Sequence, residues 1–128
     1  MLSISAERSR PDSCGVFRAQ LRWQQSYRVH HDFVGVGLVP TEGQRSRGFE
    51  LEVAVHPSDL GRIVGIYPGA GGNIDGHKGK YAKLAEHIRT NGIGAVVRCG
   101  NPIPEDHGLD VNLRAMLDYC MANAIEIC

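Results

Sequence analysis

A glycine-rich segment in the middle of the chain has the residue types that let a backbone hold negative charge. The apolar run 63–67 is followed at once by the sequence Pro-Gly-Ala-Gly-Gly at residues 68–72, and a helical pattern begins at about Lys78. In α/β proteins a strand, a glycine-rich turn and a helix in this order form a nest of backbone N–H groups. Such a nest binds either a phosphate group or the oxyanion that develops during acyl transfer.

The phosphate alternative can be compared with two known loops. Gly71 and Gly76 have the spacing of the glycines in a Walker A loop, but His77 occupies the position of the loop lysine and Lys78 the position of the Ser or Thr that binds magnesium. The dinucleotide-binding pattern fits less well, because Ile74 stands where its third glycine belongs. A phosphate- or nucleotide-binding loop is therefore kept as an alternative.

The elements before this segment are predicted from hydrophobic periodicity. Residues 49–55 alternate between apolar and acidic or small side chains, which predicts a half-exposed strand, antiparallel to the one before it. Residues 27–39 are rich in β-branched and aromatic types but contain Gly35 and Gly37, which indicates a bulge or two short strands. Residues 41–48 are predicted to form a polar turn between these strands.

The elements after it form a strand–helix–strand pattern. Residues 63–67 and 93–97 are near-continuous apolar runs, and an amphipathic helix between them ends at Asn91 and Gly92. This pattern predicts a right-handed βαβ unit with parallel strands buried on both faces. A second helix is predicted from Asp110 to the last residue. The expected fold is therefore α/β, with a β-hairpin followed by βαβα and a parallel sheet core.

The chain has 128 residues and a mass of 14.0 kDa, which is enough for one domain with a real core. Residues 1–25 are polar and without a pattern, so we expect a poorly ordered N-terminal segment, although Trp23 should pack on the body. The domain is then expected to span residues 26–128.

This order of elements resembles the N-terminal half of the α/β-hydrolase fold, over about residues 27–128. The turn 67–72 takes the place of that family's oxyanion turn, with Pro68 where a histidine is common. The resemblance implies that the backbone N–H of Ala70, helped by that of Gly71, donates to a tetrahedral oxyanion. One such donor contributes about 3–4 kcal/mol to stabilisation of the transition state.

The neighbouring residues are the candidate binding residues around that oxyanion site. They are Gly69, Gly72, Asn73 and Asp75. No metal site and no cofactor are predicted for it.

The family's nucleophile is not found in this sequence. It belongs to a G-x-S-x-G elbow that follows the fifth strand, whereas the last serine here is Ser58 and the terminal Cys128 cannot occupy a strand-to-helix turn. Loss of a triad nucleophile costs on the order of 10⁶ in kcat. We therefore interpret the chain as the N-terminal part of an ester or acyl hydrolase, truncated before the elbow and inactive by itself.

A second expectation follows because the later strands of the hydrolase fold are not found in this sequence. In the complete fold the strand 63–67 is central, so in this chain one of its apolar edges should be unpaired and open to self-association. A non-enzymatic α/β interaction module is therefore a further alternative to the hydrolase interpretation.

Two groups of polar residues invite a chemical interpretation. Asp75 and His77 could form an acid–base pair, but a turn that caps the following helix is the simpler interpretation of Asp75. His30, His31 and Asp32 could bind a metal, yet adjacent residues of a strand point to opposite faces. We do not predict a metal site there.

Three residues follow the second strand of the βαβ unit, at the carboxyl edge where α/β proteins bind ligands. Arg98, Asn101 and His107 could line a pocket at this edge, and ordinary loop polarity explains them as well.

The composition excludes several classes of partner and location. Fourteen basic residues balance fourteen acidic ones, which argues against nucleic-acid and anionic-membrane partners. The four cysteines show no C-x-x-C spacing, and Cys120 lies on the apolar stripe of the second helix, where it should pack as a small hydrophobe. No apolar run is long enough for a signal peptide core or a membrane span. We therefore expect a cytoplasmic protein that acts on a small ester or acyl substrate in its complete form.

Overall fold

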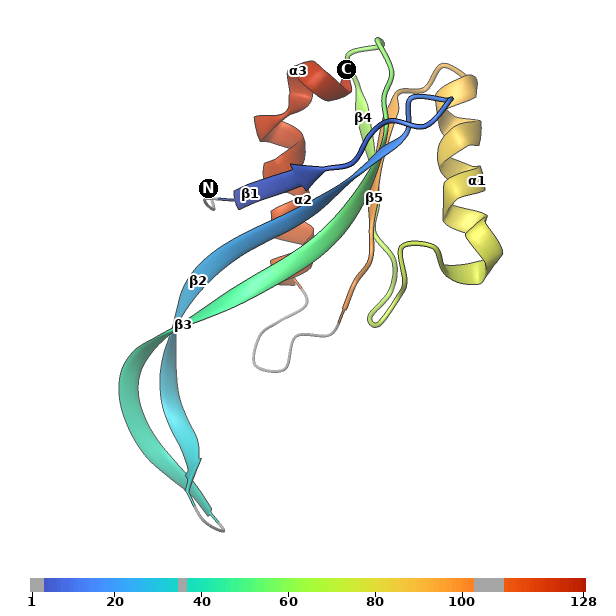
Figure 1. The fold of residues 1–128 in the computed structure, drawn as a ribbon. Helices are drawn as coiled ribbons and strands as arrows, with labels where there is room; N and C mark the ends of the chain where they lie inside the picture. Colours follow the sequence, from blue (N-terminus) through green and yellow to red (C-terminus); the bar gives the residue numbers. More distant parts are fainter. Residues whose placement is uncertain (1–3, 35–36, 103–109) are drawn as a thin grey trace.

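The computed structural model describes residues 4–34, 37–102 and 110–128, apart from the side chains of residues 25–45 and 77. These residues form one five-stranded sheet with helices on both faces (Figure 1). The strands are β1 (Ile4–Arg8), β2 (Phe17–Val34), β3 (Gly37–His56), β4 (Ile63–Ile66) and β5 (Ala95–Cys99). The helices are α1 (Gly76–Thr90), α2 (Asp110–Ala122) and α3 (Ala124–Ile127).

The sheet is mixed, with the strand order β1-β2-β3-β5-β4. Only β4 and β5 are parallel, and α1 connects them, as the βαβ pattern predicted. The other neighbours are antiparallel, including β3 and β5, which pair from Val53 with Cys99 to His56 with Val96. The α/β class is confirmed, but the predicted parallel core is reduced to one strand pair. The apolar run of β5 indicated a strand buried on both faces. Burial alone does not specify whether the neighbouring strands run parallel or antiparallel to it.

The N-terminal segment is not the unpatterned loop that the sequence suggested, because it supplies β1 and the first half of β2. Alternate residues of β2 are buried against the helices, and arginine and glutamine between them made the segment look uniformly polar. The buried residues are Phe17, Ala19, Leu21 and Trp23.

The hairpin of β2 and β3 is longer than predicted. Residues 41–48, expected to be a turn, lie within β3, and residues 43–48 pair with β2, so a two-stranded ribbon extends away from the helices (Figure 1). A register shift between Val29 and His31 marks an irregularity in β2. The interruption expected at Gly35 and Gly37 lies instead where β2 ends at Val34 and β3 begins at Gly37. The strand 49–55 is confirmed as part of β3, antiparallel to β2.

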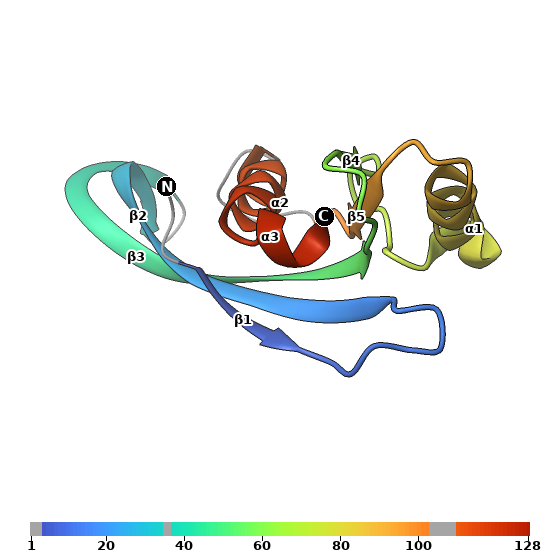
Figure 2. The same cartoon turned by 90° about the horizontal axis from the view of Figure 1, so that it is seen from above.

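Helices α1 and α2 lie on opposite sides of β5, whose five residues are all buried (Figure 2). The helix α1 begins at Gly76 rather than near Lys78, and the second predicted helix is divided at Asn123 into α2 and α3. Cys120 is buried in the core, as expected. None of the helices in the described ranges combines the length and the apolar character needed to cross a bilayer.

Candidate functional site

The glycine-rich turn lies at the carboxyl ends of the two parallel strands. It leaves β4 after Ile66 and enters α1 at Gly76. The chain that leaves β5 runs beside it, and two backbone hydrogen bonds join the two segments. Gly71 N donates to Asn101 O over 2.8 Å, and Asn101 N donates to Gly72 O over 2.9 Å. The turn is therefore tied by its backbone to the segment that follows β5.

The side chain of Asn101 holds the turn through hydrogen bonds. It is 2% exposed, and its Nδ2 donates to Pro68 O over 3.0 Å. Its Oδ1 accepts hydrogen bonds from Tyr67 Oη at 3.0 Å and from Asn112 Nδ2 at 2.9 Å. Asn112 also donates to Pro102 O over 2.7 Å. The sequence placed Asn101 at this edge as a pocket residue, whereas the structure shows a buried residue that fixes the turn.

The four N–H groups of residues 69–72 fall into two classes. Gly71 N is bonded to Asn101 O, and Gly72 N donates to Gly69 O over 2.9 Å. Gly69 and Ala70 are exposed, and their N–H groups make no hydrogen bond to any described residue. The helping donor that the resemblance implied at Gly71 is thus already engaged. Ala70 remains as the candidate oxyanion donor, with Gly69 beside it.

Asn73 and Asp75 shape the entry into α1. Asn73 Oδ1 accepts a hydrogen bond from Asp75 N over 2.8 Å, and Gly76 N donates to Asn73 O over 3.0 Å, which confirms the predicted turn. Asp75 occupies the N-cap position, but its side chain makes no capping bond. Its carboxylate instead accepts from Arg18 Nη2 at 2.5 Å and from Arg98 Nη1 at 3.4 Å.

These ion pairs affect what Asp75 can do. The hydrogen bond from Arg18 is the main cause that lowers the pKa of Asp75 below its ordinary value, which favours the charged carboxylate. A carboxylate that pairs with two arginines is a poor general base. The side chain of His77 lies outside the described part, so the acid–base pair considered for these two residues stays untested.

A buried polar network under α1 ties the end of the glycine segment to the sheet. His56, which is 2% exposed, lies with Nδ1 2.8 Å from Glu86 Oε1, and its Nε2 accepts from Arg98 Nε over 3.0 Å. Because arginine can only donate, the imidazole proton must be on Nδ1. Arg98 Nη1 also donates to Ile74 O over 2.7 Å, so this network positions the backbone just before α1.

No pattern in the sequence indicated this role for His56. It lies 30 residues from Glu86 and 42 residues from Arg98, and it was interpreted only as the end of a strand. Arg98 was expected at the ligand-binding edge, but it is 3% exposed and turned under α1.

Stability should depend on pH through His56. Burial lowers its pKa below the ordinary value of 6.5, against the opposing effect of Glu86. Below about pH 6.5 the unfolded chain therefore binds a proton that the folded chain does not, and the free energy of unfolding should fall as the pH falls. We expect His56→Gln to flatten this dependence between pH 7.5 and 5 in urea denaturation.

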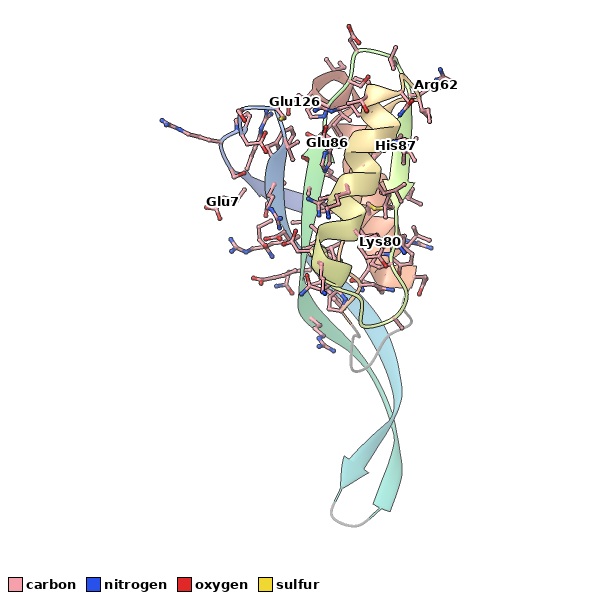
Figure 3. The ribbon with its side chains drawn as sticks, turned by 90° about the vertical axis from the view of Figure 1, so that its right-hand side faces the viewer. Glu7, Arg62, Lys80, Glu86, His87 and Glu126 are labelled. Carbon is pink, nitrogen blue, oxygen red and sulfur yellow. The ribbon has the colours of Figure 1, made fainter. Side chains whose placement is uncertain are left out.

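The exposed His87 on α1 provides a matched control, and His87→Gln should keep the slope of the unmodified chain (Figure 3). Equal slopes for His56→Gln and the unmodified chain would contradict the assignment of this pH dependence to His56.

Neither of the two buried thiols is a candidate nucleophile. Burial raises the pKa of Cys99 to about 12 and that of Cys120 to about 11, so both stay protonated at neutral pH. Only the thiolate is a competent nucleophile.

No metal site is visible in the part of the chain that the structure describes, where His, Cys, Asp and Glu side chains do not gather in groups of three or more. The side chains of His30, His31 and Asp32 lie outside that part, and so does the whole of His107.

Comparison with protein-family models, curated proteins and solved structures finds no significant match.

Proposed function

We propose that this chain is the N-terminal part of an α/β-hydrolase-like fold, with the Ala70 N–H as a donor to the oxyanion. In that family one oxyanion donor comes from the loop between the third strand and the first helix. Counted from the hairpin of β2 and β3, β4 is the third strand and α1 is the first helix. The observation that carries the proposal is the N–H of Ala70, an exposed residue on a turn fixed by Asn101, which donates to no described residue.

The order of the strands supports the same proposal. The strand β5 follows α1 in sequence, yet it is inserted between the hairpin and β4. The described strands pair with β4 on one side only. That is the arrangement expected of a hydrolase-like fold whose later strands would add beside β4.

The proposed activity of the complete protein is hydrolysis of a small ester or acyl substrate in the cytoplasm. The four free thiols fit the reducing conditions of that compartment. This chain should be inactive alone, because an oxyanion donor cannot replace a nucleophile and its general base. Purified protein should therefore hydrolyse p-nitrophenyl acetate no faster than buffer. Hydrolysis that increases in proportion to the protein concentration would contradict this part of the proposal.

The phosphate-loop alternative has less support from the turn. A phosphate cradle uses several consecutive N–H groups, and those of Gly71 and Gly72 are already bonded within the protein. Isothermal titration with ATP and magnesium should therefore give no heat of specific binding. Tight binding of the nucleotide would favour the phosphate loop over the oxyanion turn.

A further inference from the structure

The segment that leads from the glycine turn into α1 is anchored by arginine side chains. Arg98 of β5 donates from Nη1 to Ile74 O over 2.7 Å, and the same Nη1 lies 3.4 Å from the Asp75 carboxylate. Arg18 of β2 also pairs with Asp75. Among the described residues, these two arginines supply the side-chain bonds that join residues 73–76 to the sheet. Arg98 is buried whereas the Arg18 side chain is 38% exposed, so Arg98 is the firmer anchor.

The backbone just after this segment departs from regular helix. Lys78 has a φ of 57° and Gly79 has a φ of 78°, both in the left-handed region. That region is disfavoured for a residue with a Cβ atom, such as lysine. Lys78 and Gly79 therefore form an irregular joint within the first turn of α1. Residues 74–76 gain less support from the helix than residues inside a regular helix would, and their position depends on the anchors.

The position of Arg98 depends in turn on a neutral His56. Arg98 Nε donates to His56 Nε2 over 3.0 Å, and both side chains are almost fully buried. The bond needs the lone pair of Nε2, which a protonated imidazole lacks because both of its nitrogens carry hydrogen. Protonation would also place two positive charges side by side in a buried site. His56 therefore cannot bind a proton while Arg98 stays in this position.

The other ring nitrogen of His56 faces a partner for a positive charge. His56 Nδ1 lies 2.8 Å from Glu86 Oε1, and Figure 3 shows Glu86 on the side of α1 that faces β3. The Glu86 carboxylate favours the protonated imidazole, whereas burial, Arg98 and Arg89 oppose it. Burial is the largest effect and lowers the pKa of His56 below 6.5, so the proton binds on the acid side of neutrality.

Charged groups on the other elements act on Arg98. Asp75 and Glu52 of β3 attract its guanidinium, and Arg18 repels it. The Asp75 side chain is 53% exposed. If Arg98 loses its acceptor on His56, it therefore keeps a negative partner at Asp75, nearer to the solvent.

We propose that His56 is a pH switch that controls the anchoring of the glycine turn. At neutral pH it holds Arg98 against Ile74 O. In acid a proton from the solvent binds at His56 Nε2 and the imidazolium pairs with Glu86. Arg98 then leaves His56 and Ile74 and moves with Asp75 towards the solvent, so the segment before α1 loses its buried anchor.

The release reaches the glycine turn through the backbone. Gly72 lies two residues before Ile74, and its N–H donates to Gly69 O over 2.9 Å. Ala70 lies between these two bonded glycines, so displacement of Ile74 should change the direction of the Ala70 N–H. The switch does not depend on the proposed hydrolase function, because it acts on the turn whatever the turn binds.

An NMR titration of the ¹⁵N-labelled chain between pH 7.5 and 5 tests the switch. His77 is an imidazole within the segment, and a His77→Gln background removes its own titration. The amide signals of Ile74 and Asp75 should shift together, with the same midpoint as the ring protons of His56, while the amide signal of Leu21 in the core stays in place. Absence of a shift at residues 74 and 75 would overturn the proposal. Loss of the Leu21 signal at the same midpoint would also overturn it, because the whole domain would then be unfolding.

Histidine substitutions separate the switch from general effects of pH. Glutamine at position 56 offers Arg98 an uncharged acceptor that does not titrate, so His56→Gln should abolish the shift at residues 74 and 75. His87→Gln, on the exposed side of α1, is the matched control and should keep the shift. A shift that persists in His56→Gln would contradict the assignment of the switch to His56.

Glu86→Gln provides a second test in which His56 itself is unchanged. The substitution removes the charge that favours the imidazolium, so the midpoint should move to lower pH by about one unit. Glu50→Gln is the matched control, because Glu50 is exposed on β3 and pairs with Arg22, and it should leave the midpoint unchanged. A midpoint that stays in place in Glu86→Gln would show that another group controls the segment, and the proposal would be wrong.

Discussion

Replacement of Asn101 by alanine should lower the free energy of unfolding by about 3 kcal/mol. The variant removes three hydrogen bonds of the Asn101 side chain, which join it to Pro68 O, Tyr67 Oη and Asn112 Nδ2. A buried group left without a partner costs about 1–3 kcal/mol. Asn112 keeps its bond to Pro102 O, which limits the loss. Urea denaturation measures the change.

Asn123 provides the matched control for this substitution. It is half-buried and its side chain donates one hydrogen bond, from Nδ2 to Tyr119 O over 2.9 Å. Asn123→Ala should therefore cost about 1 kcal/mol. If Asn101→Ala is no more destabilising than Asn123→Ala, Asn101 does not hold the turn in the way described here.

Replacement of Gly72 by alanine should also destabilise the protein, by about 2 kcal/mol. A Cβ at this position would lie 2.7 Å from Pro68 Cβ and 2.9 Å from Gly69 O. Either the turn must open or the proline ring must move, and the bond from Gly72 N to Gly69 O is then weakened. Thermal or urea denaturation would show the loss of stability, and amide chemical shifts of residues 69–72 would show the displacement of the turn.

Gly69 lies in the same turn and provides the comparison. A Cβ there meets nothing within 4 Å, and its backbone is outside the positive-φ region. Gly69→Ala should change the free energy of unfolding by less than about 1 kcal/mol. Similar losses for the two variants would mean that the turn does not have the tight geometry described.

Local periodicity explains what could be predicted from the sequence. The strand 63–67, the helix after the turn and the parallel pairing of β4 with β5 all follow from patterns within about 40 residues. The alternation of residues 49–55 was sufficient for part of β3 because its apolar face is buried. The position of the glycine turn at the end of β4 follows from the same local pattern.

The remaining features depend on contacts between distant residues. Phe17 and Leu21 are buried in a core cluster to which β3 and α2 also contribute, and the arginines and glutamines between them concealed that alternation in the sequence. Asn101 fixes the turn through a hydrogen bond to Pro68, 33 residues earlier in the chain, and one sequence cannot reveal that contact. The antiparallel pairing of β5 with β3 is likewise a contact between distant parts of the chain, because it depends on which edge of the β2–β3 hairpin β5 joins. The position of the turn was therefore easier to predict than the residues that hold it.

The most direct test of the account is an NMR titration of the ¹⁵N-labelled chain with p-nitrophenyl phosphonate, whose tetrahedral oxyanion resembles that of acyl transfer. The account predicts that the N–H signal of Ala70 shifts most, with that of Gly69 beside it. The signal of Gly71, whose N–H is bonded to Asn101 O, should shift much less. A shift of Gly71 as large as that of Ala70, or no shift in residues 69–72, would contradict the assignment of this turn as an oxyanion site.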